Sequence, residues 1–370
     1  MKKRLFLALA LGLVLAAGLL LWVGQREPAE EPVELSYEPL RLSYHGGMIF
    51  PGISYLIMES YDPSFLESGN PWTPETEVGW LPIFKNPDNT MASLRGQELV
   101  DVAESYARRM GVNAEQSPRS NTYFPFGEDD RIIVQGRMRV LAAYLPSPVE
   151  VPASLAQSTF DHTGSLHYRY WEPLAEFFLK KYSRAIVFDE PVYSVAYGSK
   201  DMRVGYHEGA GSFQEQFVSY HFDRVDFSYD SSDSEESDNS SLTIRFTHDD
   251  FLEPAGNYPI LTLEEAKAAL DSGVYTSNLS NRELARVDLA PKAEEAVYVS
   301  LIYDKDNFNY TIPFYVFYIP RPLDLLDGFH PVSETQNGPD VYQQFYVPAI
   351  DLSYIENPEI FGPGFEQYAD

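Results

Sequence analysis

The stretch Thr262-Leu263-Glu264-Glu265-Ala266 has the pattern of a helix start. In a capping box, the Thr hydroxyl accepts the backbone N–H three residues later, and the Glu carboxylate there accepts the N–H of the Thr. Leu263, Ala266 and Leu270 then fall on one apolar face, and Gly273 suits the left-handed residue that ends a helix. The stretch therefore predicts a helix that begins after Thr262 and ends at Gly273.

Three strands are predicted after this helix, over residues 297–303, 308–319 and 341–350. The residues from Asp304 to Asn307 suit a tight turn between the first two strands. The second strand is apolar on both faces, which is typical of a strand covered on both sides. We interpret the rings of these strands as core, with a groove for a peptide or glycan as the alternative; they are Tyr298, Tyr303, Tyr310, Phe314, Tyr315, Phe317 and Tyr318.

One capped helix followed by three antiparallel strands resembles a PepSY-type module over roughly residues 256–355. The stretch from Tyr258 to Ala266 and the last strand around Tyr346–Ile350 carry this resemblance. The wider layout resembles YycH/YycI-like and uncharacterised singly anchored extracytoplasmic proteins of Gram-positive bacteria, which stack several helix-plus-sheet units. The resemblance implies interaction or regulation rather than catalysis.

The residues before Tyr258 alternate in ways that predict further strands and two helices. Helices are expected over 99–110 and from Pro173 to Lys181. The expected strands cover 132–144, 185–188, 192–197, 202–206, 218–229 with a bulge at Asp223-Arg224, and 242–246. The apolar stretch 80–87 is interpreted as a loop that plugs the first lobe, with a partner-docking edge as the alternative.

The N-terminus has the features of a membrane anchor. Lys2, Lys3 and Arg4 precede the uncharged apolar run Leu5–Val23, which is about 28 Å long as a helix and so matches a bilayer core of about 30 Å. The positive-inside rule then places everything after Gly24 outside the cytoplasm. A signal peptide cleaved near Ala16-Ala17-Gly18 is the alternative.

These segments predict an α+β fold with an N-terminal transmembrane helix and two lobes of antiparallel sheets with packed helices. The expected parts are an anchor over 1–24, a linker over 25–34, an N-terminal lobe over 35–255 and a PepSY-like lobe over 256–370. The predicted location is the cell membrane, spanned once through residues 5–23, with the bulk of the chain extracytoplasmic.

Composition excludes several classes of protein. The 370 residues include 27 Lys and Arg against 55 Asp and Glu, so the formal net charge is −28. Nucleic-acid binding needs clustered cations and is not expected. The chain has no Cys, which excludes a disulfide scaffold, a thiolate zinc site and a cysteine nucleophile.

Motifs for chemistry are missing from the sequence. It has neither a Gly-x-Ser-x-Gly elbow nor a Ser-x-x-Lys pair. No pair among His45, His162, His167, His207, His221, His248 and His330 has His-x-x-x-His spacing. We interpret the acidic stretch 230–239 as a hairpin loop, with calcium binding as the alternative. The sequence thus predicts no catalytic residue, no cofactor-binding residue and no metal ligand.

The function expected from these observations is a non-enzymatic interaction or regulatory module anchored in a membrane. Its expected partner is a membrane or envelope protein. Two alternatives stay open: a cell-envelope hydrolase with dispersed carboxylates, and a module that binds a small ligand or an ion. Whether the chain is an enzyme stays uncertain, although the sequence favours that it is not.

Overall fold

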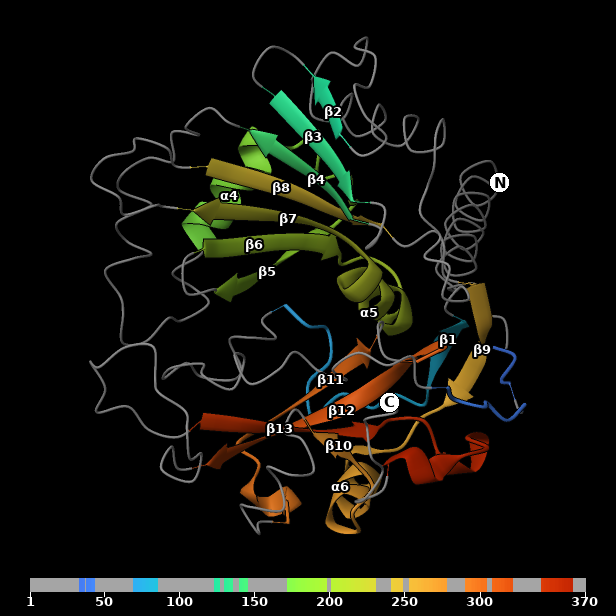
Figure 1. Cartoon of the computed structure of the whole chain (residues 1–370). Helices are drawn as coiled ribbons and strands as arrows, with labels where there is room; N and C mark the ends of the chain where they lie inside the picture. The colour runs from blue at the N-terminus through green and yellow to red at the C-terminus, as the bar shows by residue number, and fades with distance from the viewer. Residues whose placement is uncertain are drawn as a thin grey trace, which may run out of the picture. The chain divides into compact units, whose positions relative to one another are not determined.

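The computed structural model describes about half of the chain. The described residues are 33–36, 38–43, 69–85, 123–126, 130–135, 140–145, 172–197, 201–230, 241–248, 253–277, 290–304, 308–321 and 341–361. Contacts divide the chain into Met1–Ser36 and Tyr37–Asp370, and the described strands of the second unit form two sheets (Figure 1).

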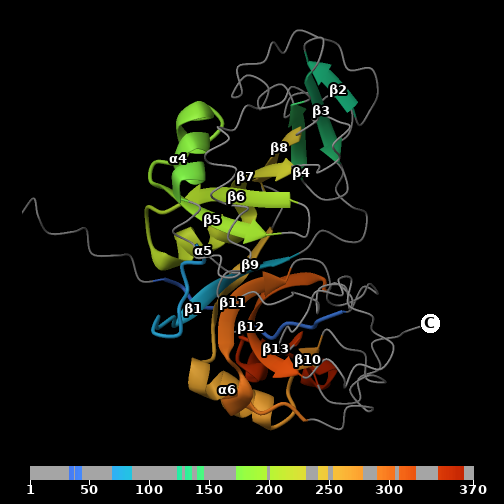
Figure 2. The same ribbon diagram turned by 90° about the vertical axis from the view of Figure 1, so that its left-hand side faces the viewer.

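The first sheet has seven strands in the order β2-β3-β4-β8-β7-β6-β5, and all neighbours are antiparallel. Helix α4 (Glu172–Lys181) lies against one face (Figure 2), where Phe178 stacks on Phe227 at 5.0 Å between ring centroids. The strands are β2 (Tyr123–Phe126), β3 (Asp130–Gln135), β4 (Val140–Leu145), β5 (Pro191–Tyr197), β6 (Asp201–Glu208), β7 (Asp223–Asp230) and β8 (Ser241–His248).

The second sheet has six strands, ordered β10-β13-β12-β1-β9 with β11 also paired to β12. The long strand β12 pairs with β13 along one edge, and with β11 and the end of β1 along the other. Its elements are β1 (Trp80–Lys85), β9 (Glu253–Pro259), α6 (Leu263–Asp271), β10 (Thr276–Ser277), the 3₁₀ turn η4 (Ala293–Glu295), β11 (Tyr298–Asp304), β12 (Tyr310–Arg321), β13 (Val341–Pro348), and the 3₁₀ turns η6 (Leu352–Tyr354) and η7 (Pro358–Phe361).

Strand β12 is the centre of the core of this sheet. Every residue from Thr311 to Ile319 is buried. Phe314 and its neighbours on one face join one apolar cluster, while Phe317 and its neighbours on the other face join a second cluster with Ala266 of α6. Phe217 and Phe222 of helix α5 (Phe213–Phe222) belong to this second cluster, so α5 connects the first sheet to the core of the second.

The structure confirms the α+β class and the elements that the sequence predicts most clearly. Helix α6 begins after Thr262, and Gly273 follows its end at a φ of 90°. Strands β11, β12 and β13 follow in the expected order and are antiparallel. Helix α4 and strands β5, β6 and β8 lie where alternation and helical spacing place them. The rings of β12 from Phe314 to Tyr318 are core.

The strand predicted over 218–229 is wrong in its first half. Residues up to Phe222 form α5, and only Asp223–Asp230 form a strand. The physical reason is a second capping box: Ser212 accepts the N–H of Glu215 at 3.3 Å, and the Glu215 carboxylate accepts the N–H of Ser212 at 2.7 Å. The predicted bulge at Asp223-Arg224 is the junction between this helix and β7.

Three other local predictions need correction. Residues 185–188 are not a strand, because Ala185 and Ile186 donate to Tyr182 O and continue the turn that ends α4. The segment 132–144 is two paired strands, β3 and β4. The predicted loop at 80–87 is strand β1 over Trp80–Lys85, paired with β9 and β12.

Sheet membership does not follow the predicted boundary between residues 255 and 256. Strand β1 comes from the predicted N-terminal lobe and lies in the second sheet, and β9 crosses the boundary. The predicted anchor at 5–23, the linker to residue 32, the helix at 99–110 and the stretch 231–239 lie outside the described residues. Among the residues that are described, no helix is long and apolar enough to cross a membrane.

Candidate functional site

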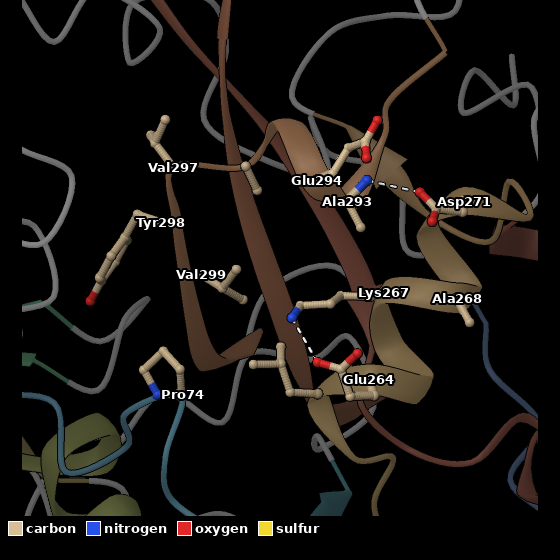
Figure 3. A pocket seen from close by; sticks show the side chains of 12 residues that line it. Pro74, Glu264, Lys267, Ala268, Asp271, Ala293, Glu294, Val297, Tyr298 and Val299 are labelled. Carbon is tan, nitrogen blue, oxygen red and sulfur yellow. Dashed lines mark hydrogen bonds and ion pairs between the residues drawn. The ribbon is translucent and has the colours of Figure 1, made fainter.

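A groove of about 680 Å³ lies beside α6 on the second sheet (Figure 3). We call it the α6 groove. Helix α6, the turn η4 and the start of β11 line it, together with one residue of the segment before β1. The lining residues are Pro74, Leu263, Glu264, Lys267, Ala268, Asp271, Ala293, Glu294, Ala296, Val297, Tyr298 and Val299.

Helical spacing explains the face that α6 presents to the groove. Ala266 and Leu270 are buried against the sheet. The groove residues 264, 267, 268 and 271 follow the i, i+3, i+4, i+7 spacing of the opposite face. Lys267 Nζ donates to Glu264 Oε1 at 2.7 Å, and Figure 3 shows the two side chains pointing toward each other. This wall is therefore charged and exposed.

The turn η4 is joined to the end of α6 by one hydrogen bond. Asp271 Oδ1 accepts the N–H of Ala293 at 2.8 Å, as the dashed line in Figure 3 shows. The Ala293 side chain is buried, while Glu294 is exposed. Val297 follows the turn, and its side chain is 59% exposed. The groove thus combines an exposed apolar side chain with exposed carboxylates.

Strand β11 forms an edge beside the groove. Among the described strands it pairs only with β12. Asn70 Nδ2 donates to the carbonyl of Leu301 at 2.9 Å, and Asn70 Oδ1 accepts the N–H of Trp72 at 3.0 Å. The carbonyl of Leu301 therefore points away from β12, and the segment around Asn70 covers the edge at that residue. Val299, two residues earlier, borders the groove instead.

The charge of the lining is unbalanced. Glu264, Asp271 and Glu294 supply three carboxylates against the single ammonium group of Lys267. We call these three carboxylates the acidic rim. The whole chain has a formal charge of −28, so the field around the groove attracts cations and repels anions.

A second cluster of polar side chains is buried in the first sheet. Arg224 donates to Asp226 Oδ1 from Nε at 3.1 Å and from Nη2 at 2.8 Å, and to Ser194 Oγ at 2.9 Å. Its guanidinium carbon lies 5.1 Å from the Tyr220 ring centroid. Burial works to lower the pKa of Arg224, but the Asp226 carboxylate and Tyr220 together, through charge and hydrogen bonds, outweigh it and the pKa is raised. The guanidinium of Arg224 therefore stays charged.

His207 lies beside this pair and is neutral. Its side chain is 1% exposed, and its ring meets the Tyr220 ring edge to face at 5.2 Å. Burial and the Arg224 cation lower its pKa to about 3, although Glu208 acts in the opposite direction. Nδ1 has no hydrogen-bond partner among the described residues.

The geometry of this cluster indicates a structural role. Asp226 and Ser194 already satisfy three of the donor positions of Arg224. Gly205 lies beneath the ion pair, and a Cβ there would collide with both the guanidinium and the carboxylate. The glycine thus provides the space for a closed polar pair rather than a cavity for a ligand.

The structure separates the histidines that the sequence singles out. His207 lies on β6, His221 on α5 and His248 on β8, while His45, His162, His167 and His330 lie outside the described residues. The described part of the chain holds no group of three His, Asp or Glu side chains that could bind a metal. Asp230 ends β7, and the rest of the acidic stretch lies beyond the described residues.

Sequence reasoning missed the α6 groove. The sequence predicts a capping box at Thr262 and Glu265, and Glu265 does cap the helix, with its carboxylate accepting the N–H of Thr262 at 2.8 Å. Glu264 instead lines the groove with Lys267 and Asp271. The signal was present in the helical spacing of these three residues, but no spacing reveals that η4, 22 residues further on, forms the opposite wall.

The resemblance to PepSY-type modules rests on the pattern of one capped helix and three strands. The structure contains that pattern, but the pattern is common among α+β folds and does not by itself show a family. The resemblance therefore stays a prediction. Comparison with protein-family models, with curated proteins and with solved structures finds no match for this chain.

Proposed function

We propose that this chain is a membrane-anchored extracytoplasmic protein that regulates or recruits another membrane or envelope protein, without catalysing a reaction. The α6 groove is the site where it binds that partner. The observation that carries the proposal is the combination, in one groove, of exposed apolar side chains such as Val297 with the acidic rim.

The chemistry of the groove favours a cationic protein segment as its ligand. Apolar residues on the walls stabilise a bound side chain by removing it from water. The acidic rim and the net charge of the chain favour lysine and arginine over acidic groups, and they speed the encounter with a basic partner. A volume of about 680 Å³ is in the range of binding pockets and suits a few side chains.

Binding is better supported than acid–base chemistry at this groove. A glycosidase needs two carboxyl groups that face one another across a cleft. Here Glu264 is ion-paired with Lys267, and Asp271 accepts a backbone N–H of η4. These interactions hold two of the three acids of the rim in structural contacts.

The test is cross-linking of the full-length chain in its native membrane, followed by mass spectrometry of the captured proteins. The decisive variant reverses two charges of the groove, Glu264→Lys with Glu294→Lys. The matched control reverses two exposed acids next to the first sheet, Glu176→Lys on α4 with Glu190→Lys just before β5, so that both proteins have the same net charge. A further control replaces residues 5–23 with an unrelated membrane anchor.

We expect one recurrent partner, captured by the wild type, by the first-sheet control and by the chain with the foreign anchor. The groove variant should lose about tenfold or more of this capture, because charge reversal at a docking site costs several kcal/mol. Equal capture by the groove variant and by its matched control would contradict the proposal.

A further inference from the structure

The outer edge of β11 changes character between Leu301 and Val299. At Leu301 the carbonyl is occupied by Asn70, whose own side chain is fixed by the N–H of Trp72. Residues along a strand alternate in the direction of their backbone groups. Val299 therefore directs its N–H and C=O to the same side as Leu301, away from β12 and toward the groove.

Exposed edges of sheets pair with other strands unless something prevents it. Proteins protect them with prolines, with charged side chains on the edge strand, or with covering loops. The segment around Asn70 covers β11 at Leu301, but the start of the strand has the sequence Val297-Tyr298-Val299, without a charge. The groove thus has an apolar edge strand on one side and exposed carboxylates of α6 and η4 on the other.

We propose that the α6 groove takes an extended, lysine- or arginine-bearing segment of the partner protein as a short extra strand on β11. The segment hydrogen-bonds to the main chain of Val299, and its cations pair with Glu264 and Glu294. This inference deepens the proposed function and rests on it, because it names how the same groove holds its partner.

Charge decides between the possible occupants of the edge. A second copy of this chain would bring another strongly acidic protein, with a formal charge of −28, against the acidic rim. A cationic extended segment removes that repulsion. Its main chain forms hydrogen bonds with the N–H and C=O of Val299. Its side chains point alternately to the acidic rim and to the apolar wall. The covered position at Leu301 limits the added strand to the first residues of β11.

The test measures binding of a labelled six-residue peptide of alternating lysine and valine to the full-length chain, by fluorescence anisotropy at low salt. The main variant is Val299→Pro, which removes one N–H that β12 does not use. Proline is tolerated on edge strands whose N–H faces outward. Val299→Thr is the matched control, because it keeps the N–H. A peptide methylated at every backbone nitrogen keeps its charges but loses its donors, so it tests the pairing without any change to the protein.

We expect saturable binding of the lysine peptide and none of a glutamate–valine peptide. Val299→Pro should weaken binding about fivefold, the equivalent of one net hydrogen bond, and Val299→Thr by less than about twofold. The methylated peptide should bind the wild-type chain no more tightly than the unmodified peptide binds the Val299→Pro variant.

Two results would overturn this inference. The first is absence of saturable binding of the lysine peptide. The second is equal binding of the methylated and unmodified peptides. Suppose that, in the second case, the double variant Glu264→Lys with Glu294→Lys still binds the peptide more weakly than the wild type does. Strand addition is then wrong, but the groove remains the docking site. The proposed function itself fails only if the double variant captures the partner by cross-linking as well as its matched control does.

Discussion

Helices α5 and α6 begin in the same way and end up in different surroundings. In both, a hydroxyl accepts the N–H of the third helical residue at 3.3 Å, and a glutamate carboxylate accepts the N–H of the capping residue, at 2.7 Å in α5 and 2.8 Å in α6. Glu215 is the one exposed residue of α5, whereas α6 exposes four. Helix α5 is part of the core, whereas helix α6 forms one wall of the α6 groove.

This comparison teaches that a capping box decides where a helix starts but not what the helix does. Packing decides that. Phe217 and Phe222 of α5 join the cluster that also contains residues of β11 and β12. Only Ala266 and Leu270 of α6 are buried, which leaves the other face free to line the groove.

The largest expected effect is at Phe217 of α5. Its ring is fully buried and lies 5.3 Å from the ring of Tyr303 and 5.5 Å from that of Phe213. Phe217→Ala should lower the free energy of unfolding by about 3–5 kcal/mol, because it leaves a cavity between α5 and the second sheet. Denaturant titration measures this, with Ala268→Gly on the exposed face of α6 as the comparison at about 1 kcal/mol. A loss near 1 kcal/mol at both sites would mean that α5 is no more part of the core than α6.

The second effect is a dependence of stability on pH that comes from His207, whose ring contacts Tyr220 of α5. The pKa of His207 is about 3 in the folded chain and near 6.5 when unfolded, so below pH 6.5 the unfolded chain binds a proton that the folded chain does not. Stability from this group is complete above pH 6.5 and falls by about 1.4 kcal/mol per pH unit as the pH decreases toward 3.

His207→Leu tests this dependence, because leucine does not titrate and has a similar size. Thermal melting at pH 6.5 and at pH 5 should show that the variant loses about 2 kcal/mol less than the wild type over this interval, in which most carboxylates do not yet titrate. The test compares the change in unfolding free energy between the two pH values, so a loss of stability that is equal at both does not affect it. Parallel pH profiles would show that His207 is not held neutral.

The third effect compares the two caps directly. Ser212→Ala and Thr262→Ala each remove the side-chain acceptor of one helix, and each should cost about 1 kcal/mol of unfolding free energy. The same change should raise the pKa values of Glu215 and Glu265, which are now lowered by the N–H and hydroxyl groups they accept. Carboxyl titration by NMR checks this. A much larger loss at Ser212 would indicate that the buried helix depends on its cap more than the exposed one does.

The caps also show why the sequence predicted one helix and missed the other. Thr262 precedes a helix whose apolar residues have the spacing of a single face, so the cap and the periodicity agree. In α5, Val218, Tyr220 and Phe222 alternate as in a strand, because the helix is buried on several sides and has no simple polar face. The capping box Ser212–Glu215 was the signal that distinguished the two structures.

Sheet membership and the groove depend on pairings that are distant in sequence. The sequence predicts a loop over 80–87, whereas Trp80–Lys85 is a strand because it pairs with β9 and β12, which lie far away in the sequence. Leu81 and Ile83 pack into the two apolar clusters of the second sheet. In the groove, the spacing of α6 was readable. Its opposite wall depends on a hydrogen bond from Ala293 to Asp271 that no local pattern contains.

The smallest expected effect on stability is at the acidic rim, and it separates the two roles of the α6 glutamates. Glu264→Gln removes an exposed ion pair with Lys267 and should change the free energy of unfolding by less than about 0.5 kcal/mol. Glu265→Gln, one residue away, weakens the cap of the same helix and should lower the free energy of unfolding by more.

For binding of the lysine–valine peptide the order of the two variants should reverse, because Glu264 lines the groove and Glu265 does not. Anisotropy at two salt concentrations then shows whether the rim acts through charge: the difference between the two variants should shrink as added salt screens it.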